Sequence, residues 1–279
     1  MAGQKDAQRG IQSIEVGGQL LRALVHHGRP MALKDLAREA DMTAAKAHPY
    51  MVSFGRLGLI EQDSGNGHYQ LGPLALQLGL ISLQQANPVQ VAGPLAAQLA
   101  RQIGQTVAIV VWGDRGATIV HMAESPAPVH VNMRHGTVFS LADTASGKLF
   151  AAFRDAGEVR RLLDEERKRR RQQARPAGDG DGDAAARPMG MPPEHPLPAW
   201  DVFEPQLKAV RRRGLSRSEG EVIPGVNAMA APVFDHAGEL VLALTAIGPA
   251  GVFDIAWDGA AAQAMLACAR EASRRLGAR

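Results

Sequence analysis

TAAKAHPYMVSF, residues Thr43 to Phe54, has the pattern of a helix with a proline in its interior. Thr43 is a favoured N-cap residue, and the apolar residues Ala47 and Met51 follow it at helical spacing. Pro49 removes one backbone hydrogen bond and crowds a preceding carbonyl group, which costs a helix interior about 3 kcal/mol. Pro49 is therefore expected either to kink this helix or to begin a second one, because proline is well tolerated at the first helical position.

The segments around this helix follow the order of a winged helix-turn-helix. Apolar residues recur at helical spacing over residues 11–28 and 33–40, and a tight turn separates the second of these helices from Thr43. Two short strand-like runs come next, joined by the turn SGNG at residues 64–67, which predicts a β-hairpin. This order predicts a winged helix-turn-helix domain over residues 1–72.

In a helix-turn-helix, the second helix of the motif enters the major groove with its first residues against the base edges. The residues expected to contact DNA here are Thr43, Ala44, Ala45, Lys46, His48 and Pro49. Residues 1–72 contain eight basic and seven acidic side chains, so the charge of one copy does not favour strong binding to DNA. We therefore expect two DNA-binding domains to act together in a dimer.

A linker helix and a second domain are predicted after the hairpin. Residues 73–87 form the linker helix, which Asn87 and Pro88 are expected to end. In residues 88–279, strand-like runs occupy 106–113, 117–124, 128–136, 227–235 and 239–248, and helical patterns occupy 94–103 and 255–276. This mixture predicts an α+β domain built on an antiparallel sheet.

Residues 165–198 differ from the rest of the second domain. A basic run is followed by Gly and Asp residues and then by prolines, with almost no branched aliphatic side chains. This composition predicts a flexible insertion. The alternative is a basic tail that binds nucleic acid, although a basic run is usually a solvated surface.

A second helix start lies in SLADTASGKLFAAF, residues 140–153, where Asp143 or Thr144 can act as the cap. The backbone N–H groups of Ala145, Ser146 and Gly147 then lack helical partners. Small side chains at these positions leave room for an anion to approach. This is a physical reason to place a carboxylate-bearing ligand here, although local sequence alone favours an ordinary capped helix.

Other chemistries find little support in the sequence. The chain has 279 residues, 46% hydrophobic, with a net charge of +3, which permits packed cores and does not demand an anionic partner. DGDGD at residues 179–183 lacks the glutamate that completes a calcium loop, and the single cysteine, Cys268, cannot form a thiolate zinc site. No nucleophile elbow is present. We expect no cofactor, no metal and no enzyme activity.

The same sequence predicts the compartment. The first residues are charged where a secretory signal needs an apolar core, and the longest apolar stretch is about half of the roughly 20 residues that a membrane helix requires. One cysteine fits a reducing compartment. We expect a cytoplasmic protein without membrane contact.

The chain resembles the IclR family of bacterial transcriptional regulators along nearly its whole length. Three stretches carry the resemblance: DLAREADMTAAKAHPYMVSFGRLGLIEQD with HYQLGP, then TASGK at residues 144–148, then GVNAMAAPVFD and VLALTAIGP within residues 225–249. The resemblance implies a winged helix, a linker helix and an effector-binding domain similar to GAF domains. It also implies dimers or tetramers that bind a near-palindromic operator, with the linker helix as a pairing surface.

The resemblance further implies an effector pocket between the TASGK helix start and facing strands. Matched by position, its residues are Val131, Met133, Ala145, Ser146, Ser218, Val226, Ala228, Thr245 and Ile247, to which the helix-start argument adds Gly147. Ser218 and Ile247 stand where the family commonly has more polar residues. This favours a small carboxylate effector with an apolar or aromatic body.

Pro49 stands where many family members have Arg or another polar residue. The substitution weakens the expectation that this position contacts bases or phosphates. An alternative therefore stays open: a small-molecule-binding protein whose winged helix no longer recognises DNA specifically.

Overall fold

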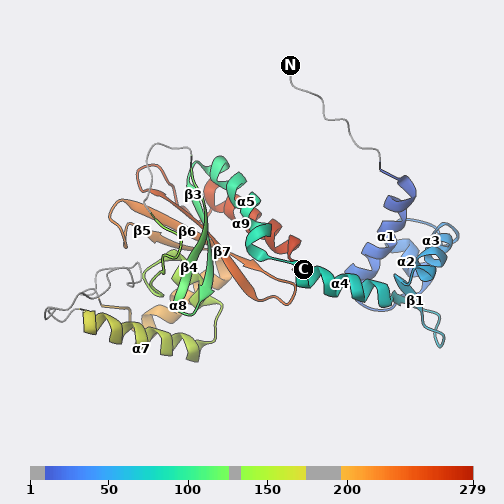
Figure 1. Cartoon of the computed structure of the whole chain (residues 1–279), viewed down its shortest axis with the longest axis horizontal. Coiled ribbons are helices and arrows are strands. Elements are labelled where there is room, and N and C mark those ends of the chain that lie inside the picture. Colours follow the sequence, from blue (N-terminus) through green and yellow to red (C-terminus); the bar gives the residue numbers. More distant parts are fainter. Residues whose placement is uncertain (1–9, 126–132, 174–195, 279) are drawn as a thin grey trace, which may run out of the picture. The chain divides into compact units, whose positions relative to one another are not determined.

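The computed structural model describes residues 10–125, 133–173 and 196–278 (Figure 1). These residues divide into two compact units, one ending at Ala86 and the other beginning at Asn87. Each unit has its own apolar core, so each is described separately. Over the described residues, no helix combines the length and the apolar character needed to cross a membrane.

The first unit has the predicted order of helices and hairpin. Its elements are α1 (Gln12–His27), α2 (Leu33–Glu39), α3 (Ala44–Arg56), β1 (Ile60–Gln62), β2 (Tyr69–Leu71) and α4 (Pro73–Gln85). Leu20, Leu36 and Met51 from the first three helices meet in the core. Helices α1 and α3 approach closely at Gly17, because a Cβ atom there would lie within 3.0 Å of the Tyr50 and Phe54 rings.

The second unit is a five-stranded antiparallel sheet with helices on both faces, and it confirms the predicted α+β class. The strand order is β4-β3-β7-β6-β5. The strands are β3 (Thr106–Gly113), β4 (Gly116–Ala123), β5 (Ser216–Glu219), β6 (Val226–Phe234) and β7 (Leu240–Pro249). The helices are α5 (Pro88–Ile103), α6 (Ala145–Ala152), α7 (Ala156–Gln173), α8 (Trp200–Arg213) and α9 (Ala260–Arg275).

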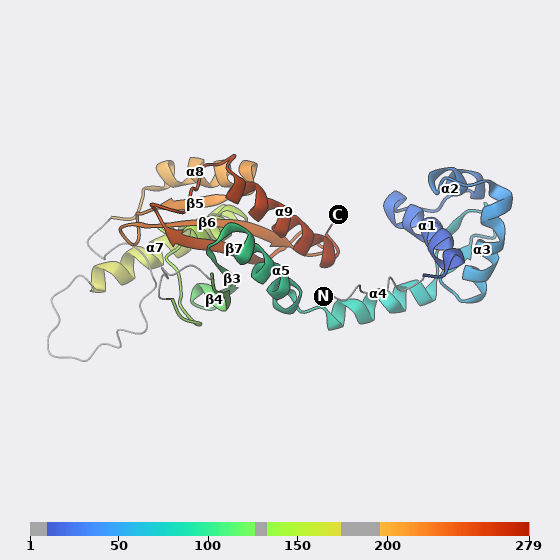
Figure 2. The same ribbon diagram turned by 90° about the horizontal axis from the view of Figure 1, so that it is seen from above.

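Alternate residues of each strand face the two helical layers. Val107, Met229 and Leu244 pack toward α5 and α9, whereas Ala108 and Ala230 pack toward α6, α7 and α8. Figure 1 shows α5 and α9 on one side of the sheet and α7 and α8 on the other, and Figure 2 shows the strands side by side from above. Because both faces of the sheet are covered, β3, β6 and β7 are largely apolar, whereas the short edge strand β5, with the sequence SRSE, is polar.

Three sequence predictions need correction. Residues 165–173 are not part of a flexible insertion, because they continue helix α7, and the remainder through residue 195 lies outside the described residues. Residues 133–136 form a loop and turn where a strand was expected. Helix α5 begins at Pro88 rather than at residue 94, because the Asn87 side chain accepts hydrogen bonds from the N–H groups of Val89 and Gln90 and caps the helix there.

Candidate DNA-binding surface and effector cavity

Helix α3 presents the residues that were predicted to contact DNA. Thr43 caps the helix, its hydroxyl accepting a hydrogen bond from the Lys46 N–H at 3.3 Å. The predicted contact residues Thr43, Ala44, Ala45, Lys46, His48 and Pro49 are all exposed. Ala47 and Met51 on the same helix are buried in the core of the first unit. The helix thus separates a packed face from an open one.

Pro49 lies inside α3, and the helix continues through it to Arg56. The idea that Pro49 begins a separate helix is therefore wrong. Because proline has no N–H, the Ala45 carbonyl lacks the donor four residues ahead that an α-helix normally supplies. Both residues are exposed, so this carbonyl lies on the open face of α3. The Ser53 hydroxyl donates to the Pro49 carbonyl one turn further on, at 3.0 Å.

In the second unit, α6 begins in the interior. The Thr144 hydroxyl accepts a hydrogen bond from the Gly147 N–H at 2.9 Å, and Ala145 and Ser146 are each 1% exposed. A Cβ atom on Gly147 would lie 2.0 Å from the Ser140 carbonyl oxygen. Gly147 therefore packs against the preceding loop, and its N–H is already used by the cap.

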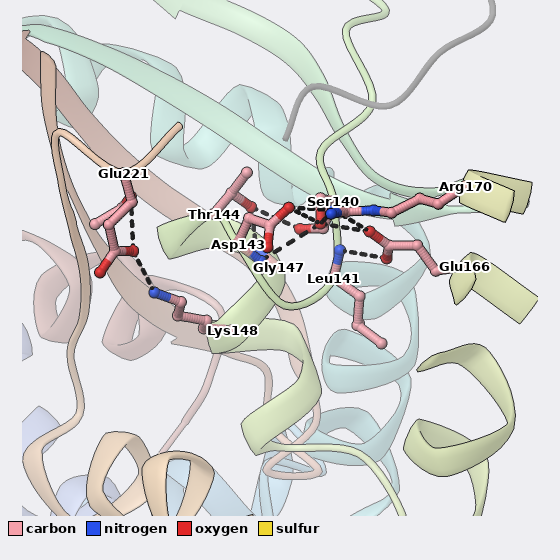
Figure 3. A network of polar contacts seen from close by, with 10 residues as sticks. Ser140, Leu141, Asp143, Thr144, Gly147, Lys148, Glu166, Arg170 and Glu221 are labelled. Atoms are coloured by element: carbon pink, nitrogen blue, oxygen red, sulfur yellow. Dashed lines mark hydrogen bonds and ion pairs between the residues drawn. The ribbon is translucent and has the colours of Figure 1, made fainter. Parts of the chain in front are cut away.

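A buried polar network holds this loop in place (Figure 3). Glu166, from α7, accepts hydrogen bonds from the Ser140 hydroxyl at 2.5 Å and the Leu141 N–H at 2.9 Å. The Arg170 guanidinium donates to Glu166 at 3.0 Å and also to Asp143. The four residues Ser140, Asp143, Glu166 and Arg170 are each at most 9% exposed. Helix α7 therefore fixes the approach of the chain to the start of α6.

A cavity of about 40 Å³ lies next to the start of α6. Its lining residues are Met133, Phe139, Thr144, Ala145, Ser146, Ser218, Val222, Ile223, Val226, Ala228, Thr245 and Ile247. Of the ten residues predicted to bind an effector, the structure brings Met133, Ala145, Ser146, Ser218, Val226, Ala228, Thr245 and Ile247 together here. Gly147 is not in the lining, and Val131 lies outside the described residues.

The cavity has a small polar centre in an apolar wall. The Ser146 and Thr245 hydroxyls form a hydrogen bond of 2.9 Å, and the Ser218 hydroxyl lies nearby in the lining. Among the described residues, no charged side chain contributes to the lining. Such a site suits a small molecule with a polar group at one end and an apolar body. A cavity of this size holds a few water molecules, whereas sites for larger ligands have volumes of about 300 Å³ or more, so a larger ligand requires the wall to move.

Sequence reasoning missed the loop that forms part of this wall. Val222 and Ile223 line the cavity from the irregular segment between β5 and β6. Beside them, the Glu221 carboxylate is 2.8 Å from Lys148 Nζ. Val222 and Ile223 could not be identified from the local sequence, because the segment that contains them has neither helical nor strand periodicity. The only available signal was its position just before the predicted strand at 227–235.

The other candidate chemistries lack support in the described part of the chain. Burial raises the pKa of the Cys268 thiol to about 11, so it is protonated at neutral pH and a poor nucleophile. The residues with described positions contain no group of three or more His, Cys, Asp or Glu side chains that could hold a metal ion.

Two models of known protein families match the chain, one in its N-terminal part and one in its C-terminal part. The model of the IclR helix-turn-helix domain matches residues 13–64. The model of the bacterial transcriptional regulator IclR C-terminal domain matches residues 81–175 and 198–274. The gap in the second match covers most of the segment between α7 and α8 that lies outside the described residues.

Individual relatives match along almost the whole chain. The glycerol operon regulatory protein of Streptomyces griseus is 31% identical over 274 residues, which cover 97% of this chain and 98% of that protein. The protein of the same name from Streptomyces coelicolor is 28% identical over 275 residues. Among solved structures, HmgR from Pseudomonas aeruginosa has a TM-score of 0.80 and 32% identity, over 96% of this chain and 99% of that one.

Proposed function

The chain belongs to the IclR family of bacterial transcriptional regulators, and from this premise we propose that its binding to operator DNA is controlled by a small organic acid held in the cavity at the start of α6. The relatives are transcriptional regulators rather than enzymes, in agreement with the sequence prediction. A regulator of this kind acts in the cytoplasm, where bacterial DNA lies.

The open face of α3 supports the DNA-binding part of the proposal. Thr43, Ala44 and Lys46 at its start are exposed while the opposite face packs into the core. We propose that these residues, with Ala45, His48 and Pro49, enter the major groove. Small side chains let the backbone approach the bases, and Lys46 supplies one positive charge to phosphate.

The apolar surface of α4 supports an assembly of more than one copy. Helix α4 has no charged residue, and none of its side chains is buried within one copy. Leu76, Leu78, Leu80 and Ile81 are each more than half exposed. Apolar side chains gathered in this way usually mark an interface. We propose that α4 pairs with its equivalent in a homodimer or homotetramer, which places two α3 helices on one operator.

The cavity carries the effector part of the proposal. Three hydroxyl groups, from Ser146, Ser218 and Thr245, lie among apolar side chains at a buried helix start. The hydroxyls can donate hydrogen bonds to a carboxylate, and the remaining wall suits an aromatic or aliphatic body. By linkage, an acid that changes operator affinity must have its own affinity changed by operator DNA by the same factor.

The first test is fluorescence anisotropy of the full chain on DNA from upstream of its own gene. A shuffled fragment serves as the control, at two salt concentrations. Preferential binding that survives the higher salt supports specific recognition by α3. Equal, salt-labile binding to both fragments contradicts recognition of this site.

The cavity is tested by Ser146→Trp, which places a large side chain among the three hydroxyls. We expect this variant to keep its DNA affinity and to lose its response to acids that act on the wild type. Ala237→Trp, on the exposed turn after β6 and outside the cavity lining, is the matched control and should respond normally. An unchanged dose-response curve for Ser146→Trp would show that the effector binds elsewhere.

Pro49 and the near-neutral charge of residues 1–72 favour a second candidate function, a small-molecule-binding protein without specific DNA recognition. Pro49→Arg discriminates the two. A gain of specific DNA binding from none would favour this second candidate. Specific binding already present in the wild type would exclude it.

A further inference from the structure

One wall of the cavity is the loop between β5 and β6. Val222 and Ile223 from this loop line the cavity. Gly220 and Gly225 bracket them with φ angles of +64° and +79°, in the left-handed region that favours glycine. The loop is thus a short segment with a glycine at each end, set between two strands that are held in the sheet.

The loop is attached to the start of α6 through a single acidic side chain. The Glu221 carboxylate lies 2.8 Å from Lys148 Nζ and accepts a hydrogen bond from the Ser218 hydroxyl at 3.4 Å. Ser218 lines the cavity, and Lys148 follows the lining residue Ser146 by two positions. Figure 3 shows Lys148 on α6 directed at Glu221 on the loop. A carboxylate of the chain itself therefore binds a cation and a hydroxyl at the edge of the cavity.

Charge decides what this arrangement means for an acidic ligand. Among the described residues no cation lines the cavity, and the lining hydroxyl of Ser218 is bonded to Glu221, so an acid that binds this hydroxyl meets the negative charge of Glu221. Lys148 can balance only one of the two carboxylates well. Its side chain is 14% exposed whereas that of Glu221 is 49% exposed. An ion pair with one well-solvated partner is weak, so the partner can be exchanged.

The neighbouring cation is already engaged. Arg217 lies 4.5 Å from the centre of the Trp257 ring and donates to the Ile255 carbonyl at 3.2 Å. Its side chain is held on these groups, while its carbonyl oxygen lies 3.5 Å from Lys148 Nζ. Between these two described cations, Lys148 is consequently the one that can change its carboxylate partner.

We propose that Glu221 takes the place of the effector's carboxylate, and that an entering acid displaces it from Lys148 and Ser218. Displacement releases the loop, so Val222 and Ile223 can move and make room that the 40 Å³ cavity lacks. Lys148 then determines the preference for acids over neutral molecules. This inference rests on the proposed function, because it assumes that the cavity binds the effector.

The test uses two probes of the same shape, phenylacetate and its neutral amide, phenylacetamide. Their affinities for the full chain are measured by titration calorimetry in the wild type, Glu221→Gln and Lys148→Met. We expect Glu221→Gln to bind phenylacetate about tenfold more tightly, with less than about twofold change for the amide. Lys148→Met should lose the preference for the acid. Glu219→Gln, an exposed acid on the neighbouring strand, is the control and should resemble the wild type.

The ratio of acid to amide affinity separates this role from a structural one. Equal changes for both probes in Glu221→Gln, or an acid preference that persists in Lys148→Met, would overturn the proposal. Binding of neither probe to any variant would overturn it as well. Ser146→Trp separates failure of the displacement from failure of the proposed binding site. If Ser146→Trp abolishes phenylacetate binding while Glu221→Gln leaves the ratio of acid to amide affinity unchanged, the cavity is the binding site and only the displacement of Glu221 is wrong. If it leaves phenylacetate binding intact, the proposed site itself fails.

Discussion

Helices α3 and α6 begin with almost the same residues, TAAK at 43–46 and TASGK at 144–148. In each, a threonine hydroxyl accepts a hydrogen bond from the N–H three positions ahead, at 3.3 Å for Thr43 and 2.9 Å for Thr144. The first turn of α3 is exposed, whereas that of α6 is buried. The shared residues determine that a helix begins, and the packing around each start determines whether its first turn is open to solvent or buried.

The difference arises from what precedes each helix. Before α6, the loop at Ser140 and Asp143 is tied to α7 by Glu166 and Arg170. No equivalent buried polar group holds the described chain before Thr43. The buried start therefore depends on charges and close contacts that the exposed start does without, and four experiments test this comparison.

The largest effect is expected from Arg170→Met. This change leaves the Asp143 and Glu166 carboxylates buried without the guanidinium, which typically costs about 3–5 kcal/mol of the free energy of unfolding. Urea denaturation of the second unit measures it. Lys168→Met, on the exposed side of the same helix, is the control and should stay within about 0.5 kcal/mol of the wild type. Equal midpoints for both variants would show that α7 does not stabilise the start of α6.

Glycine-to-alanine substitutions should have opposite signs in the two helices. In α6, the Cβ atom of Gly147→Ala would lie 2.0 Å from a backbone oxygen, so we expect a loss of about 3 kcal/mol. In α3, Gly55 has nothing within 4 Å of its added Cβ, and Gly55→Ala should stabilise the helix by about 1 kcal/mol. Thermal unfolding of each variant provides the measurement. The same sign at both positions would contradict the contrast between the two helices.

Pro49→Ala tests whether the proline on the exposed face of α3 lowers the stability of the first unit. Alanine restores the missing N–H to the Ala45 carbonyl, so we expect the first unit to gain about 2 kcal/mol. Thermal unfolding followed by circular dichroism reports the gain, and operator anisotropy reports its effect on recognition. No gain in stability would mean that α3 already accommodates the proline without cost.

The smallest difference is expected between the two caps. Thr144→Ala should cost about 1.5 kcal/mol and Thr43→Ala about 0.5 kcal/mol, both within the usual range of about 0.5–2 kcal/mol for loss of a capping residue. The first is larger because Thr144 is 5% exposed and its hydroxyl also donates to the Ser140 carbonyl at 2.8 Å. Urea midpoints of the two units give both values. A larger loss of stability in Thr43→Ala than in Thr144→Ala would contradict the view that the buried helix start depends more on its cap than the exposed one does.

Local patterns predicted much of the fold because its elements have local signals. The strand run at 106–113 coincides with β3, and those at 227–235 and 239–248 fall on β6 and β7. The extent of α7 was not predictable in this way. Glu166 and Arg170 belong to a charged run that looks uniformly solvated, and their burial depends on contacts about 25 residues away in the chain.

The candidate cavity was predicted mainly through the family resemblance. Strand alternation places Ala228 and Thr245 on the same sheet face only once the register between β6 and β7 is known. The local argument about the start of α6 identified Ser146 correctly as a lining residue and misjudged Gly147, whose N–H goes to the Thr144 cap. The loop with Val222 and Ile223 had no periodic signal at all.

The connection between α7 and α8 has a practical consequence. Helix α7 ends at Gln173 and α8 begins at Trp200, and the family match skips residues 176–197 between them. The family model therefore matches the chain on both sides of this connection and not within it. We expect a fluorescent protein inserted into this connection to be tolerated, because added chain length between two helices costs little free energy. The insertion would turn the chain into an optical sensor for the proposed effector.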